Sequence, residues 1–126
     1  MHLGAVSLLV ADYDAAIAWF TQALGFALLE DTDMGGGKRW VKVAPSGGQT
    51  AMILAKASSP EQIAQIGRQG GDRVWLFLNT DDFARDHARM TSAGVEFEEA
   101  PRVEPYGTVA VWRDPFGNRW DLIEAS

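Results

Sequence analysis

The chain has 126 residues, of which 47% are hydrophobic and 22% charged, a balance typical of a globular domain with its own core. Seventeen acidic residues against eleven basic ones give a net charge of −6, which argues against a nucleic-acid binder, and the absence of cysteine excludes disulfides and thiolate metal sites. No apolar stretch reaches the ~20 residues of a membrane span and the N-terminus lacks a signal-peptide pattern, so we expect a cytoplasmic protein without membrane contact.

The first part of the sequence predicts a strand, a helix and three further strands. Residues 5–10 form a short β-rich apolar run, and Asp12 after it is a typical N-cap for a helix that Gly25 ends. Apolar side chains between these two residues recur at helical spacing. Alternation of apolar and polar residues and the flanking turn residues predict the next strands at residues 26–30, 39–43 and 50–55.

A linker and a second copy of the same order of elements follow. Residues 57–72 have the composition of a linker with one short helix, because Pro60 occupies a favoured first helical position. A helix is predicted from Asp81-Asp82 to Gly94. The strands of this part are predicted at residues 74–78, 95–97, 107–113 and 120–124.

The two halves are related by a long internal repeat. At an offset of 69 residues Asp12 falls on Asp81, and at an offset of 70 Gly47 falls on Gly117. A repeat this long indicates a duplicated module, and the alternative is chance matching of common turn residues. We therefore expect one α+β domain, residues 1–126, built from two βαβββ modules at about residues 1–56 and 73–126.

Four motifs occur in this order along nearly the whole chain. They are VADYD at residues 10–14, which leads to Trp19-Phe20, then LGF at 24–26, AGV at 93–95 and DPFGNRWDL at 114–122. Together they resemble the vicinal oxygen chelate superfamily, which includes glyoxalase I, extradiol dioxygenases and bleomycin-resistance proteins. The resemblance implies a cup-shaped, curved mixed sheet with the helices outside and a binding site in the cup.

The resemblance also places up to four metal ligands, one on the first and one on the last strand of each module. Carried over to this sequence, these positions are Ala5, Ala51, Trp75 and Asp121. Three of the four side chains cannot bind a metal, since a divalent ion needs several converging N or O donors. We therefore expect no metal and no other cofactor, and the alternative is an atypical site that uses His2 or Asp121.

The period-2 rule for strands predicts which side chains face the cup. If Val109 and Val111 face a helix, as Val41 and Val43 are expected to do, the cup receives an aromatic set made up of Trp40, Trp75, Phe77 and Trp112, with Tyr106 at its rim. We predict that this set binds a small organic ligand and that Asp121 supplies charge. The alternatives are tryptophans that only fill space and a salt bridge from Asp121 to Arg119 or Lys42.

The predicted function is sequestration of a small organic ligand, such as an antibiotic or xenobiotic, in an aromatic cup without metal. One alternative is a lyase, isomerase or oxygenase of the same superfamily, and another is a structural dimer without a ligand. His87 is expected to pack between a helix and the sheet rather than to bind a metal. Open sheet edges predict a homodimer.

Overall fold

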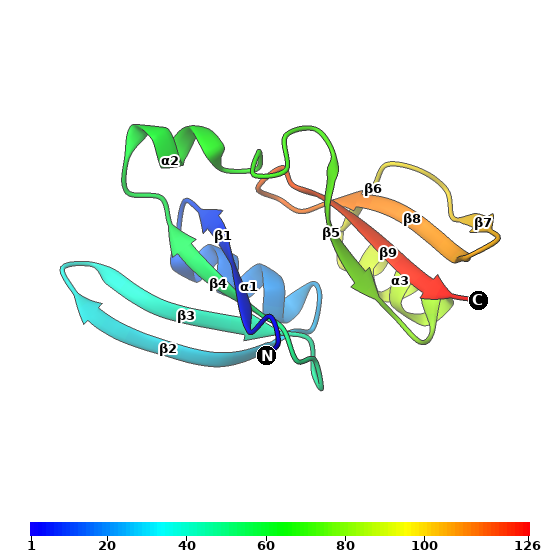
Figure 1. Cartoon of the computed structure of the whole chain (residues 1–126), viewed down its shortest axis with the longest axis horizontal. Coiled ribbons are helices and arrows are strands. Elements are labelled where there is room, and N and C mark those ends of the chain that lie inside the picture. Colours follow the sequence, from blue (N-terminus) through cyan, green and yellow to red (C-terminus); the bar gives the residue numbers. More distant parts are fainter. The chain divides into compact units, whose positions relative to one another are not determined.

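The computed structural model describes all 126 residues, which form two compact units, Met1–Ile66 and Gly67–Ser126. We call them unit 1 and unit 2, and each consists of a sheet with a ten-residue helix (Figure 1). The α+β class predicted from the sequence is therefore confirmed. None of the helices is long and apolar enough to cross a membrane.

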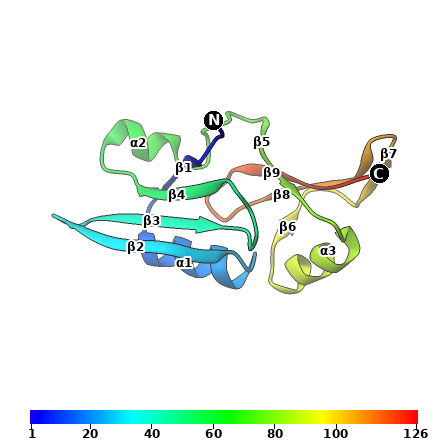
Figure 2. The same cartoon turned by 60° about the horizontal axis from the view of Figure 1, so that its bottom comes forward.

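The sheet of unit 1 has the strand order β1-β4-β3-β2. Its strands are β1 (Ala5–Val10), β2 (Ala27–Gly35), β3 (Lys38–Ala44) and β4 (Ala51–Lys56). β1 and β4 are parallel, and the other pairs are antiparallel. Helix α1 (Tyr13–Gln22) lies along one face of this sheet (Figure 2), and the short helix α2 (Pro60–Gln65) follows β4.

The core of unit 1 lies between α1 and the sheet. Asp12 begins the helix as predicted, because its side chain accepts a hydrogen bond from the backbone N–H of Ala15. Phe20 of α1 is fully buried, as are the alternate strand residues Leu8, Val10, Val41, Val43 and Leu54. The sheet face opposite α1, here called the open face of unit 1, carries Ser7, Lys42 and Ile53 in register.

The sheet of unit 2 has the strand order β5-β9-β8-β6, and β7 pairs with β8 as well. Its elements are β5 (Val74–Asn79), α3 (Phe83–Ser92), β6 (Glu96–Phe97), β7 (Arg102–Glu104), β8 (Gly107–Arg113) and β9 (Arg119–Ala125). Four strands therefore follow α3 where the sequence predicts three. The strand expected at residues 95–97 is only two residues long, and β7 was not predicted. Pro101, which lacks a backbone N–H, lies between these two short strands.

Aromatic packing dominates the core of unit 2. The indole rings of Trp112 and Trp120 stack with their centroids 4.7 Å apart, and both side chains are buried. His87 of α3 stacks on Phe83, and its ring centroid lies 4.3 Å from that of Phe97 in β6. As predicted, His87 therefore packs between the helix and the sheet.

In strand β8 the residues predicted to face the helix lie on the opposite face of the sheet. Trp112 pairs with Phe97, which contacts α3 through His87, and it also pairs with Trp120. Trp112 therefore lies on the α3 face and is fully buried. Val111 pairs with Asp121 on the opposite face, which we call the open face of unit 2. The prediction that Val109 and Val111 face the helix and that Trp112 faces the cup is wrong.

The length of one turn explains the reversal. In unit 1, residues 44–51 separate the paired residues Val43 and Met52, whereas in unit 2 only residues 114–118 separate Arg113 from Arg119. The two turns therefore differ in length by three residues. Because three is an odd number, this difference shifts the pairing register so that every side chain of the strand lies on the other face of the sheet.

Asp114 holds the shorter turn together. The side chain is only 4% exposed, and its Oδ1 accepts hydrogen bonds from three backbone N–H groups. Its Oδ2 accepts two more, from Asn118 Nδ2 and Trp120 Nε1, each at 2.9 Å. The turn also requires glycine at 117, where φ is +112°. A Cβ on neighbouring Gly67 would lie 2.0 Å from the carbonyl oxygen of Phe116.

Removing the Asp114 carboxylate leaves several buried donors without partners. We expect Asp114→Ala to lower the free energy of unfolding by about 3 kcal/mol, measured by urea denaturation. Asp12→Ala, which removes a single exposed helix cap, is the matched control and should cost about 1 kcal/mol. Equal losses in the two variants would contradict the role given to the turn.

Candidate functional site

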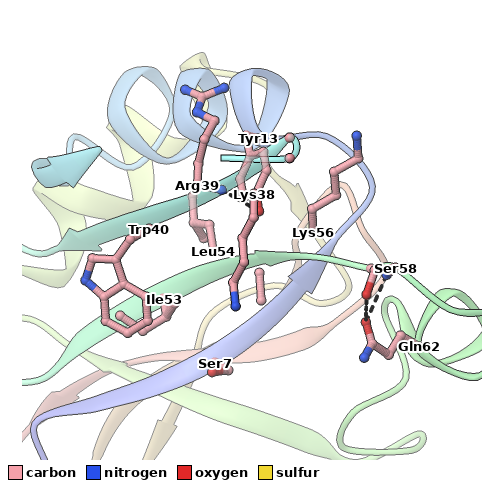
Figure 3. A pocket seen from close by; sticks show the side chains of 14 residues that line it. Ser7, Tyr13, Lys38, Arg39, Trp40, Ile53, Leu54, Lys56, Ser58 and Gln62 are labelled. Atoms are coloured by element: carbon pink, nitrogen blue, oxygen red, sulfur yellow. Dashed lines mark hydrogen bonds between the residues drawn. The ribbon is translucent and has the colours of Figure 1, made fainter. Parts of the chain in front are cut away.

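A pocket of about 540 Å³ opens at one end of the sheet of unit 1 (Figure 3). Strands β1, β3 and β4 contribute most of its walls, and Ser58 and Gln62 close one side. Gln62 is held in place because its Oε1 accepts hydrogen bonds from both the backbone N–H and the hydroxyl of Ser58. The remaining lining includes Ser7, Tyr13, Lys38, Arg39, Trp40, Ile53, Leu54 and Lys56.

Trp40 supplies the largest apolar surface of this pocket. The strict alternation of β3 buries Val41 and Val43 against α1 and leaves Trp40 39% exposed on the open face. Its indole lies near Ile53 of β4, and Ser7 of β1 pairs with Ile53 (Figure 3). The pocket therefore has an apolar floor beside a partly exposed aromatic ring.

Arg39 lines the same pocket but has a structural role. Its guanidinium forms a two-point contact with Asp31, at 2.7 and 3.1 Å, and a 2.9 Å ion pair with Asp14 of α1. Arg39 in turn holds the pKa of the Asp31 carboxyl below its usual range, mainly through that hydrogen bond. Its backbone N–H donates to Tyr13 Oη. These contacts tie α1 to β2 and β3 and neutralise the Arg39 charge.

Two lysines line the pocket without an ion pair. Lys38 begins β3 and Lys56 ends β4, and neither ammonium group lies within salt-bridge distance of a carboxylate. Figure 3 shows their side chains pointing in opposite directions, with Lys38 on the side of Ser7 and Lys56 on the side of Arg39. Only Lys38 therefore shares a face of the sheet with Trp40.

Asp121 lies on the open face of unit 2, as predicted. It pairs with Val111 on one side and with Phe77 on the other, and the Phe77 ring is 62% exposed. Its Oδ1 is buried and has no hydrogen-bond partner, and burial raises the pKa of the carboxyl. The alternative of a salt bridge to Arg119 is wrong, because Arg119 binds Glu98 at 2.9 Å.

Two of the other predicted site residues, Trp112 and Tyr106, lie away from Asp121. Trp112 lies beneath α3, as described above, and Tyr106 is exposed at the turn between β7 and β8. Trp75 occupies an irregularity in the pairing of β5 with β9 and packs against Gly70. The structure thus brings Asp121 and Phe77 together in unit 2 and places Trp40 in the pocket of unit 1.

Sequence reasoning missed Lys38, Ser58 and Gln62. The alternation that placed Trp40 on the open face also applies to Lys38, two residues earlier on the same strand. The Ser59-Pro60-Glu61-Gln62 segment is a helix start of the capping-box type, and its Gln62 is the residue that reaches back toward Ser58. Both signals are therefore present in the sequence.

The residues of this chain do not fit a bound metal ion. Ala5 and Ala51, at two of the positions where the resemblance places ligands, are paired on β1 and β4 and offer only methyl groups. No group of three or more His, Asp or Glu side chains gathers anywhere in the structure in a way that could hold a metal.

Because the pKa of Asp121 is raised, we expect its carboxylate to make the free energy of unfolding depend on pH. Its folded-state pKa lies above the ordinary 3.8, so the ionised carboxylate destabilises the fold above that pKa and the cost disappears below 3.8. Asp121→Asn should therefore raise the free energy of unfolding at neutral pH, and the gain should vanish as the pH falls through the folded-state pKa. Urea denaturation at a series of pH values measures the difference.

The control for this prediction is Glu61→Gln, which changes the net charge equally at an exposed position of α2. It should leave the stability nearly unchanged across the same pH range. A loss of stability in Asp121→Asn at neutral pH would mean that the carboxylate makes favourable contacts in the fold.

Several known proteins are similar to this chain in sequence and in structure. An uncharacterized protein of Shewanella frigidimarina (strain NCIMB 400) is 50% identical over 121 residues, which cover 94% of this chain and 90% of that protein. UcmS2, whose crystal structure is known, is 31% identical to this chain in sequence, and the two structures superpose with a TM-score of 0.83. The match covers 98% of this chain and 97% of UcmS2. TnmS3, described as an antibiotic binding protein from Streptomyces sp. CB03234, is 32% identical with a TM-score of 0.81, over 100% and 97% of the two chains.

A family model extends the match to nearly the whole sequence. It covers residues 2–122, and thus includes both units, the pocket of unit 1 and the Asp114 turn. The chain belongs to the Glyoxalase/Bleomycin resistance protein/Dioxygenase superfamily.

Proposed function

We propose that the protein binds a small planar organic ligand and sequesters it without a metal. The observation that carries this proposal is the pocket of unit 1, in which the partly exposed Trp40 ring stands beside Ile53 on the open face. A cavity of about 540 Å³ falls within the usual range of small-molecule sites, roughly 300–1,000 Å³. The likeness to TnmS3, described as an antibiotic binding protein, supports the same class of ligand.

The physical basis is the burial of aromatic surface. An exposed indole in a concave site gains free energy when a flat ring covers it, both from apolar burial and from offset stacking. The second unit offers a similar element, because Phe77 is exposed beside the half-buried Asp121 carboxylate. We therefore assign ligand contact in the pocket of unit 1 to Trp40. Phe77 and Asp121 of unit 2, with Trp75 and Tyr106, are candidates for a separate ligand contact on that unit. Trp112 supports the core only.

The competing function is an enzyme, such as a lyase, isomerase or oxygenase of the same superfamily. Such an activity in this family depends on metal donors at positions that here are Ala5, Ala51 and Trp75. Metal analysis of the purified protein, together with assays for turnover, distinguishes the two functions. Stoichiometric, tightly held metal together with turnover would mean that the protein is an enzyme and that sequestration is wrong.

Loss of the Trp40 ring tests the binding proposal directly. A thermal-shift screen of planar aromatic compounds, antibiotics among them, should find ligands that raise the melting temperature. Trp40→Ala should weaken their binding by about 1–2 kcal/mol, roughly tenfold or more in Kd, because the stacking surface is lost. Isothermal titration calorimetry measures the change.

The matched control is Ile63→Ala, which truncates an exposed apolar residue of α2 that does not line the pocket. It should bind ligand as the parent protein does. A screen without any stabilising compound would instead favour the third alternative, a structural dimer without a ligand. Phe77→Ala tests separately whether unit 2 contributes to binding.

We also propose that the protein is a homodimer. β1 and β2 are edge strands in the sheet of unit 1, and β2 exposes Leu28 and Leu29. Unpaired edges with apolar side chains favour association, and two-fold symmetry is the commonest solution. Light scattering should give a mass of about twice the chain's 13.7 kDa. A mass near 13.7 kDa at micromolar concentration would contradict the dimer.

A further inference from the structure

We propose that the ligand carried by the unit 1 pocket is an anionic aromatic compound, whose carboxylate or phenolate is bound by Lys38 while its ring stacks on Trp40. This inference rests on the proposed function, because it assigns a ligand class to the same pocket. It concerns the charge of the ligand, which the fold and the family do not decide.

Position on the strand brings the two side chains together. Lys38 and Trp40 are two residues apart on β3 and therefore leave the sheet on the same face, and Lys42 continues the row. Figure 3 shows Lys38 and Trp40 on the side of Ser7, whereas Arg39 between them leaves β3 on the opposite side. The Cα atoms of Lys38 and Trp40 are therefore one two-residue repeat, roughly 7 Å, apart along the strand.

The acidic residues near Lys38, Trp40 and Lys42 lie beside other cations, so the charge of Lys38 has no carboxylate partner. Arg39 is neutralised by Asp14 and Asp31 on the α1 side of the sheet. On the open face, Lys42 lies opposite Glu30 of the neighbouring strand β2. Lys38 lies opposite Gly35, which carries no side chain, because β2 is irregular between Asp33 and Gly35.

The positive charge of Lys38 contrasts with the net negative charge of the chain. The chain carries a net charge of −6, so the unpaired cation in its pocket cannot be ascribed to a generally basic surface. Lys38 is exposed at the edge of this pocket, so its attraction for an anion is screened by solvent and adds to the stacking on Trp40 rather than replacing it. A flat ring with an acidic substituent satisfies the indole and the ammonium group at once.

Three probes with the same ring test the inference. They are 2-naphthoate, the neutral 2-naphthamide and the cationic 2-naphthylmethylammonium ion, titrated calorimetrically into the full chain. We expect the naphthoate to bind about tenfold more tightly than the amide, which reflects one charge-assisted hydrogen bond, and the cation to bind most weakly. The preference for naphthoate should shrink at high salt.

Three variants locate the charge that produces the preference. Lys38→Gln should bring naphthoate down to the affinity of the amide and leave the amide unchanged, and Lys38→Arg should keep the preference. Lys42→Gln removes the next lysine on the same face of β3, which lies opposite Glu30 and does not line the pocket, and should retain the full preference. A preference that survives Lys38→Gln would overturn the assignment.

The outcomes separate this inference from the function beneath it. If all three probes bind the parent protein equally and Trp40→Ala weakens all of them, the anionic ligand class is wrong and small-molecule binding stands. If the cation binds best, the pocket selects the opposite charge. If none of the probes binds, both the ligand class and the aromatic binding site are rejected.

Discussion

The carboxylate of Asp114 decides the architecture of unit 2. By accepting five hydrogen bonds within one short turn, it fixes where β8 ends and β9 begins. The register that follows pairs Trp112 with Trp120 and Val111 with Asp121. Because side chains alternate, this one anchor determines that the two indoles form the core under α3 and that the carboxylate of Asp121 lies on the other side.

Much of this fold was predictable from the sequence, because local rules and long-range packing agree there. Asp12 and Asp82 are helix caps, and the residues that follow them form helices of the expected position. The strict alternation around Trp40 identified both faces of β3 correctly. In β8 the run Val109 to Trp112 is apolar throughout, so it carries no alternation from which the faces could be read.

The site was predictable only where a single strand defines it. Trp40 and Asp121 each lie on an open sheet face, as alternation indicated. The pocket itself needs the segment after β4, where Ser58 and Gln62 form its side wall. That wall depends on how α2 follows β4, which periodicity within one strand does not describe. The lack of a carboxylate opposite Lys38 likewise depends on an irregularity of β2.

The short Asp114 turn also has a consequence for how the two units of this chain differ. A strand paired through a turn that is longer or shorter by an odd number of residues exchanges its buried and exposed sides without any substitution along its length. Such a change of turn length places Trp112 on the helix face of the sheet and Val109 and Val111 on the opposite face. Two units with similar architecture can thus present different side chains on corresponding sheet faces because of turn length alone.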